Sequence, residues 1–154
     1  MNATLIPLRR KPIPRRQTLI PLRETAPLPR YATRVLGAAL AAAAYLTCLP
    51  WDLRNRAETA GSIDETSPVT ATGATALVLA LLSLSAYFGL RDRLPWTLVL
   101  VAAPPSALMF VSFDSHPTQD ANVWPLTWAF VTLVMGVGVL VTAGVARRFR
   151  TVED

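Results

Sequence analysis

The residues with the clearest recognition chemistry form a repeat near the N-terminus. The six residues Thr4–Arg9, TLIPLR, recur without change as Thr18–Arg23, and a Pro-X-Pro-Arg sequence follows each copy. A proline-rich peptide is already extended, so it loses little entropy on binding, and two copies raise the apparent affinity for a partner. We therefore expect partner binding through Leu5, Ile6, Pro7, Leu8, Arg9, Leu19, Ile20, Pro21, Leu22 and Arg23.

Two other interpretations of the repeat are open. The leucine and isoleucine side chains could adsorb to a lipid interface while the arginines contact lipid phosphates. Alternatively, the repeat is a neutral tandem duplication in a tail that has no fixed structure.

Catalytic and cofactor chemistry have little support in this sequence. Asp114, His116 and Asp120 fall in one short loop without the spacing of a metal site, so we expect no metal ligands. Cys48 is the only cysteine, and no phosphate-binding loop or nucleophile elbow occurs. We expect no carboxylate embedded among the apolar segments, which disfavours a proton-coupled antiporter. The expected protein is not an enzyme and binds no cofactor.

Four uncharged apolar segments follow the tail, and any functional site in the rest of the chain would be held by them. The last contains 23 residues, and as a helix it would extend roughly 34 Å, enough to cross a hydrocarbon core of about 30 Å. The sequence therefore predicts an all-α fold, an integral membrane bundle of four transmembrane helices. The expected spans are residues 35–51, 74–90, 96–113 and 124–146, within a domain of residues 35–150.

The basic residues predict the orientation of these spans. Thirteen of the fifteen Lys and Arg residues lie before residue 35, in the 91–93 loop or after residue 146. The positive-inside rule then places both termini in the cytoplasm. Only one of the fifteen is a lysine, a bias typical of GC-rich bacterial genes, so we expect a bacterial inner (plasma) membrane. The excess charge suits anionic lipid rather than nucleic acid, because no aromatic residue precedes Tyr31.

The N-terminal tail, residues 1–34, is rich in proline and arginine. Proline inside a helix removes a hydrogen-bond donor and clashes with the preceding turn. We therefore expect an extended, disordered tail without regular helix, joined to the first span near residue 35.

Special residues also occur within the expected spans. Pro104 and Pro105 should break the third span and deprive two carbonyls of their donors, with Ser106 or a water as replacement. Such a break either lines a transport site or is a packing kink. Small residues let helices approach closely, so we expect the first and last spans to pack on each other. The expected packing residues are Gly37, Ala41, Gly138 and Thr142.

Together these features indicate a non-catalytic membrane subunit or scaffold. Its tail would bind another membrane or cytoplasmic protein, and its bundle would contact membrane lipid. The alternative is a small homo-oligomeric pore, holin-like protein or transporter, supported by the proline break and the weakly apolar first span.

Overall fold

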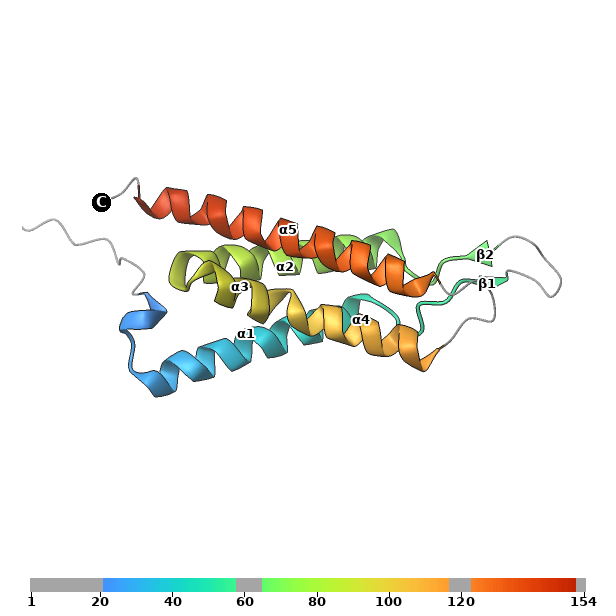
Figure 1. The fold of residues 1–154 in the computed structure, drawn as a ribbon, viewed down its shortest axis with the longest axis horizontal. Coiled ribbons are helices and arrows are strands. Elements are labelled where there is room, and N and C mark those ends of the chain that lie inside the picture. The colour runs from blue at the N-terminus through green and yellow to red at the C-terminus, as the bar shows by residue number, and fades with distance from the viewer. Residues whose placement is uncertain (1–20, 58–64, 117–122, 152–154) are drawn as a thin grey trace, which may run out of the picture.

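Four long helical segments lie side by side in a computed structural model that describes residues 21–57, 65–116 and 123–151 (Figure 1). The helical elements are η1 (Leu22–Glu24), α1 (Pro27–Cys48), α2 (Ala71–Arg91), α3 (Leu94–Val101), α4 (Ala103–Ser115) and α5 (Trp124–Thr151). Between α1 and α2, the two-residue strands β1 (Arg56–Ala57) and β2 (Glu65–Thr66) pair antiparallel.

Four helices are long and apolar enough to cross a membrane. They are α1, α2, the α3–α4 segment and residues 124–149 of α5, which contain 22, 21, 22 and 26 residues. Large apolar side chains cover much of their outer surface, for example Leu79, Phe130 and Leu133. The prediction of an all-helical chain with four candidate membrane spans is therefore confirmed.

The first helix begins at Pro27 rather than near residue 35. The expectation that residues 1–34 contain no regular helix is therefore wrong for residues 27–34. Pro27 and Pro29 occupy the first turn, where backbone N–H groups have no partner within the helix. The missing proline donors consequently cost nothing there.

The third span bends at Ala102, which separates α3 from α4. Helical hydrogen bonds continue on both sides: the Ala102 N–H donates to Leu98 O at 2.9 Å, and the Ser106 N–H donates to Ala102 O at 3.2 Å. The bend precedes Pro104 because a proline ring crowds the turn before it. Both prolines thus lie in the first turn of α4.

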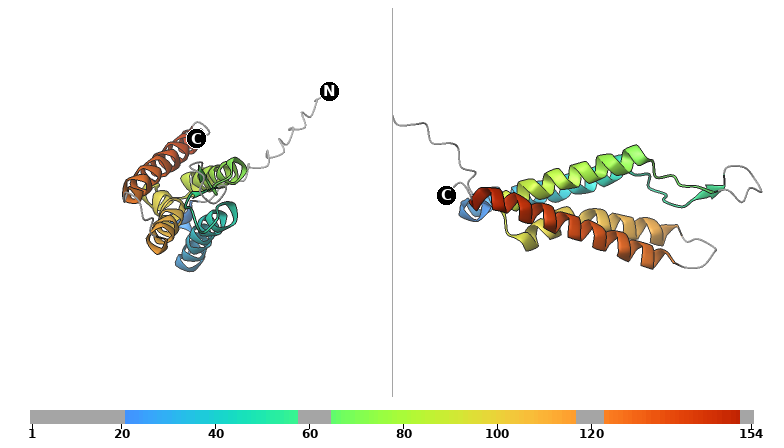
Figure 2. Two further views of the ribbon diagram at one scale, coloured as in Figure 1. Left: turned by 90° about the vertical axis from the view of Figure 1, so that its right-hand side faces the viewer. Right: turned by 90° about the horizontal axis from the view of Figure 1, so that it is seen from above.

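The spans are arranged with α2 and the α3–α4 segment between α1 and α5 (Figures 1 and 2). The helix α5 packs most extensively along α2, and α1 packs against α2, α3 and α4. The predicted packing of the first span on the last is therefore wrong. The small residues of α1, Gly37 and Ala41, instead lie against the interior, where both are buried.

Candidate functional site

An aspartate is buried in the turn between α2 and α3. The helix α2 ends at Arg91, and the Asp92 N–H donates to Phe88 O at 2.7 Å. The Asp92 side chain is only 2% exposed. Its Oδ1 accepts a hydrogen bond from the Arg93 N–H at 2.8 Å. The chain therefore holds a carboxylate inside one end of the bundle.

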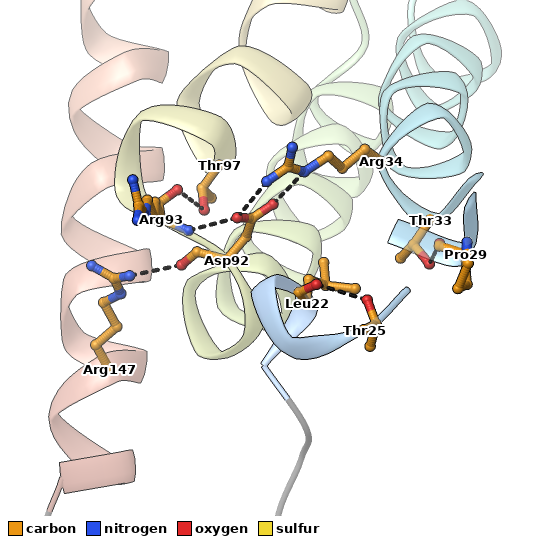
Figure 3. Close-up of polar contacts among 9 residues, drawn as sticks. All are labelled: Leu22, Thr25, Pro29, Thr33, Arg34, Asp92, Arg93, Thr97 and Arg147. Atoms are coloured by element: carbon orange, nitrogen blue, oxygen red, sulfur yellow. Dashed lines mark hydrogen bonds and ion pairs between the residues drawn. The ribbon is translucent and has the colours of Figure 1, made fainter. Parts of the chain in front are cut away.

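Arg34 of α1 neutralises this carboxylate. The Arg34 Nε donates to Asp92 Oδ2 at 2.7 Å, and Nη2 donates to Oδ1 at 2.8 Å, as Figure 3 shows. The guanidinium also lies over the Trp96 ring, 4.1 Å from its centroid. A two-point contact of this kind is among the stronger hydrogen-bonded pairs in proteins, and the aromatic face shields the cation.

Arg147 of α5 binds the same turn through its backbone. Its Nη2 donates to Asp92 O at 2.7 Å, as Figure 3 shows. Its Nε donates to Gly89 O at 3.1 Å. These carbonyls end α2, where the helix dipole favours a cation. We call Arg34, Asp92, Trp96 and Arg147 the Asp92 cluster. It connects all four spans at one end of the bundle.

Two glycines bring the helices close enough for these contacts. A Cβ atom on Gly37 would overlap the Phe88 ring, and one on Gly89 would lie 2.6 Å from Ala143 Cα. The first contact brings α1 against α2 one turn after Arg34. The second brings α5 against α2 one turn before Arg147. A larger residue at Gly89 would separate α2 from α5, and a larger residue at Gly37 would displace the buried Phe88 ring that packs against α1.

The burial of Asp92 at one end of the bundle, in the turn between the second and third spans, was not predicted from the sequence. In the sequence, Asp92 is flanked by Arg91 and Arg93 between two apolar spans, which is typical of a solvated turn. Its partner Arg34 lies 58 residues away. One signal was available: a single acidic residue stands in a two-residue connection between α2 and α3, beside apolar helices on both sides. Such a short turn leaves little solvent around the side chain.

The Asp92 cluster can hold helices together but has little capacity for reaction chemistry. Both carboxylate oxygens of Asp92 accept hydrogen bonds. The Arg34 guanidinium contacts Asp92 through its N–H groups and the Trp96 ring through its face. Among residues 21–57, 65–116 and 123–151, no three His, Cys, Asp or Glu side chains are placed to hold a metal ion. The geometry is that of a structural tie.

The second copy of the repeat ends against the same part of the bundle. Pro21 and Leu22 are buried, and Leu22 is 2% exposed within the hydrophobic core that includes Phe88 and Val101. Leu22 is therefore not accessible to a partner in this conformation. The other apolar positions predicted for partner binding, and Arg9, lie outside the described residues; these are Leu5, Ile6, Pro7, Leu8, Leu19 and Ile20. The Arg23 side chain is also outside the described set.

The residues at the proline break form contacts between α4 and α5. Pro105 and Ser106 are buried, and Pro104 is half-buried. The Ser106 hydroxyl shares a 2.8 Å hydrogen bond with Thr132, and the Trp128 indole N–H donates to Ser106 O at 2.9 Å. We expected the Ser106 hydroxyl to pair with a carbonyl freed by the prolines. Its hydrogen bond in the structure is instead to the neighbouring helix.

The predicted packing residues of α5 have different surroundings. Thr142 is half-buried, and its hydroxyl donates to Gly138 O at 2.8 Å within the same helix. A Cβ atom added to Gly138 would meet nothing within 4 Å. Gly138 therefore faces open space in the single chain.

No family model, curated protein or solved structure matches this chain. Its function is therefore inferred from its own residues.

Proposed function

We propose that the protein is a non-catalytic membrane scaffold or accessory subunit that binds a partner protein through its N-terminal tail. The observation that carries this proposal is the Asp92 cluster beside the buried end of the repeat. The buried charges of the cluster bind other residues of the same bundle, and such contacts would make the bundle a rigid support for the tail. The described residues that precede α1, 21–26, lie at the end of this support where the tie lies (Figures 1 and 3).

The first copy of the repeat is the one suited to bind a partner. Leu22 of the second copy is buried against the bundle and is not available to a partner. Eleven residues, 10–20, lie between Arg9 and Pro21. Fully extended, such a segment would span at most about 40 Å. The first copy can therefore contact a protein well outside the bundle while the second copy holds the tail in place.

The arginine-rich end is proposed to face the cytoplasm. Arg30, Arg34, Arg91, Arg93, Arg147 and Arg148 lie in or near the end that carries the Asp92 cluster, whereas Arg54 and Arg56 lie in the connection between α1 and α2. The positive-inside rule puts such an end in the cytoplasm, beside anionic lipid headgroups. In this orientation the first copy would meet a cytoplasmic protein or the cytoplasmic face of another membrane protein.

The pore, holin-like or transporter alternative receives less support. It depended on the proline break as the lining of a path. The hydroxyl and the carbonyl of Ser106 beside that break are hydrogen-bonded to α5, through Thr132 and Trp128. These contacts support a packing kink.

The decisive experiment removes one repeat and leaves the bundle intact. Deleting residues 4–17 removes one 14-residue unit and leaves Thr18–Arg23 in place. A longer deletion through residue 30 would remove Leu22 and the start of α1, and would damage the bundle itself. We expect co-purification of the partner in gentle detergent to fall at least about tenfold, because the deletion removes the copy that contacts the partner and Leu22 of the remaining copy is buried in the bundle.

Two controls keep length and composition constant. Scrambling residues 4–9 should abolish co-purification, whereas scrambling residues 10–17 should preserve it. Membrane insertion of every variant is measured by extraction and thermal unfolding. Equal partner recovery from the deletion variant and the parent chain would contradict the proposal. A lone symmetric oligomer that conducts ions in liposomes would favour the pore alternative.

A further inference from the structure

The end of the bundle beside Asp92 buries a proline–leucine turn. Pro21 and Leu22 are both buried, and the short helix η1 begins at Leu22. The Glu24 N–H donates to Pro21 O at 3.0 Å. Thr25 donates to Leu22 O through its N–H at 3.2 Å and through its Oγ1 at 2.7 Å. We call the surroundings that bury Pro21 and Leu22 the Leu22 site.

The sequence contains a second segment with the same apolar side chains. Pro7 and Leu8 occupy in Thr4–Arg9 the positions that Pro21 and Leu22 occupy in Thr18–Arg23. A site that recognises its occupant by packing around a proline and a leucine has no means to distinguish identical side chains. We propose that the Leu22 site is a peptide-binding site for this proline–leucine turn, and that Thr4–Arg9 of the same chain exchanges with Thr18–Arg23 within it.

The length of the connecting chain explains why the second copy occupies the site. Four residues, 23–26, connect Leu22 to the start of α1 at Pro27, whereas eighteen residues, 9–26, would connect Leu8 to the same point. Loop closure becomes less probable roughly as the three-halves power of loop length, so the second copy is favoured about tenfold.

Local sequence adds to this preference. Thr25, whose hydroxyl closes the turn, stands three residues after Leu22, while the first copy has Lys11 at the corresponding position. The first copy is therefore the weaker ligand and occupies the site when the second copy is removed. This exchange goes beyond the proposed function, because it requires no partner protein.

The first test follows a thiol introduced into the first copy of the full-length chain. Cys48 is the only cysteine, so C48A/L8C carries one thiol that reports on the first copy. In detergent, a water-soluble maleimide should modify this thiol rapidly while Leu22 occupies the site. Adding L22R, which excludes the second copy, should slow the modification at least fivefold because the first copy is now buried. An unchanged rate would overturn the proposal.

The matched control is a leucine outside both copies. Leu28 lies in the first turn of α1 and is 83% exposed, so L28R adds the same charge without emptying the site. We expect L28R to leave the modification rate of C48A/L8C unchanged. Equal slowing by L28R and L22R would show a general effect of charge and would overturn the proposal.

A second measurement does not depend on the folding of L22R. In C48A/L22C the thiol occupies the Leu22 site and should be protected from maleimide. A synthetic peptide of residues 1–12 at about 5 mM, comparable with the effective concentration of a short tether, should accelerate modification at least twofold. The same peptide carrying L8R should have no effect. No acceleration by the unaltered peptide would overturn the proposal.

Dilution separates exchange within one chain from exchange between chains. For C48A/L8C/L22R reconstituted at one chain per lipid vesicle, protection of the thiol should persist. Loss of protection on dilution would assign the occupant to a neighbouring chain and would overturn exchange within one chain.

Discussion

Arg34 and Asp92 form a two-point ion pair inside one end of the bundle, with N–O distances of 2.7 and 2.8 Å, although 58 residues separate them. The Arg34 side chain is 11% exposed and that of Asp92 is 2% exposed. Neither charge could remain in this position without the other, because an unpaired charge in a low-dielectric interior is strongly unfavourable. The two charges are therefore stable in the interior only when α1 is packed against the α2–α3 turn.

Breaking this pair should destabilise the bundle. R34A or D92A should each lower the free energy of unfolding by about 3–5 kcal/mol, because each leaves a buried charge uncompensated. R34K should recover only part of the loss, since a lysine cannot make the two-point contact or stack on Trp96 in the same way. Unfolding in detergent, followed by circular dichroism, measures the effect.

An exposed ion pair provides the control for this prediction. Arg54 and Asp52 are 2.9 Å apart but lie in the connection after α1, with the Arg54 side chain 41% exposed. Solvent screens such a pair, so R54A should leave the unfolding curve unchanged. Equal effects of R34A and R54A would show that the buried pair does not stabilise the bundle.

Glycine-to-alanine substitutions should distinguish the effect of close helix contact on stability from the effect of helix propensity. G89A places a Cβ atom 2.6 Å from Ala143 Cα, so α2 and α5 must move apart. Overpacking of this kind costs about 1–3 kcal/mol. G138A meets nothing within 4 Å and should stabilise α5 by about 0.5–1 kcal/mol, because alanine is the better helix former.

The two glycine variants are compared by thermal unfolding in the same detergent. Opposite signs are expected, with G89A the less stable. Stabilisation by both substitutions would mean that α2 and α5 are not in close contact at Gly89.

The kink at Ala102 should be required for the hydrogen bond between Ser106 and Thr132. P104A and P105A together restore backbone donors to the first turn of α4 and should straighten the segment. A double-mutant cycle of S106A and T132A should give a coupling of about 0.5–1.5 kcal/mol in the parent chain and none in the P104A/P105A chain. Equal coupling in both would show that the kink does not position Ser106.

The cost of losing Leu22 should depend on the first copy of the repeat. Truncating a buried leucine to alanine removes about 2–5 kcal/mol of stability. If Thr4–Arg9 can replace Thr18–Arg23 in the Leu22 site, L22A should cost less in the full chain than in a chain lacking residues 4–17. Thermal unfolding of the four chains of this cycle measures the difference. Equal costs in the two backgrounds would argue against replacement.

Some boundaries could be predicted from local sequence, and others required the structure. Thr70 precedes α2 and is a residue type that favours an N-cap, and its Oγ1 accepts from the Gly73 N–H at 3.1 Å. The start of α1 was not predicted, because Pro27 and Pro29 suggest a break unless their position in a first turn is known. The same ambiguity applies to Pro104 and Pro105, which begin α4 and do not end the span.

The sequence by itself determined the four apolar helices and their order. Each uncharged apolar stretch is a local property, and its preference for helix in an apolar medium depends little on the other stretches. Only the tertiary structure decided which helices are neighbours. That choice brought Arg34 and Arg147 to the turn at Asp92 and buried Leu22 beside it, because side chains distant in sequence meet only when the facing surfaces of their helices are set.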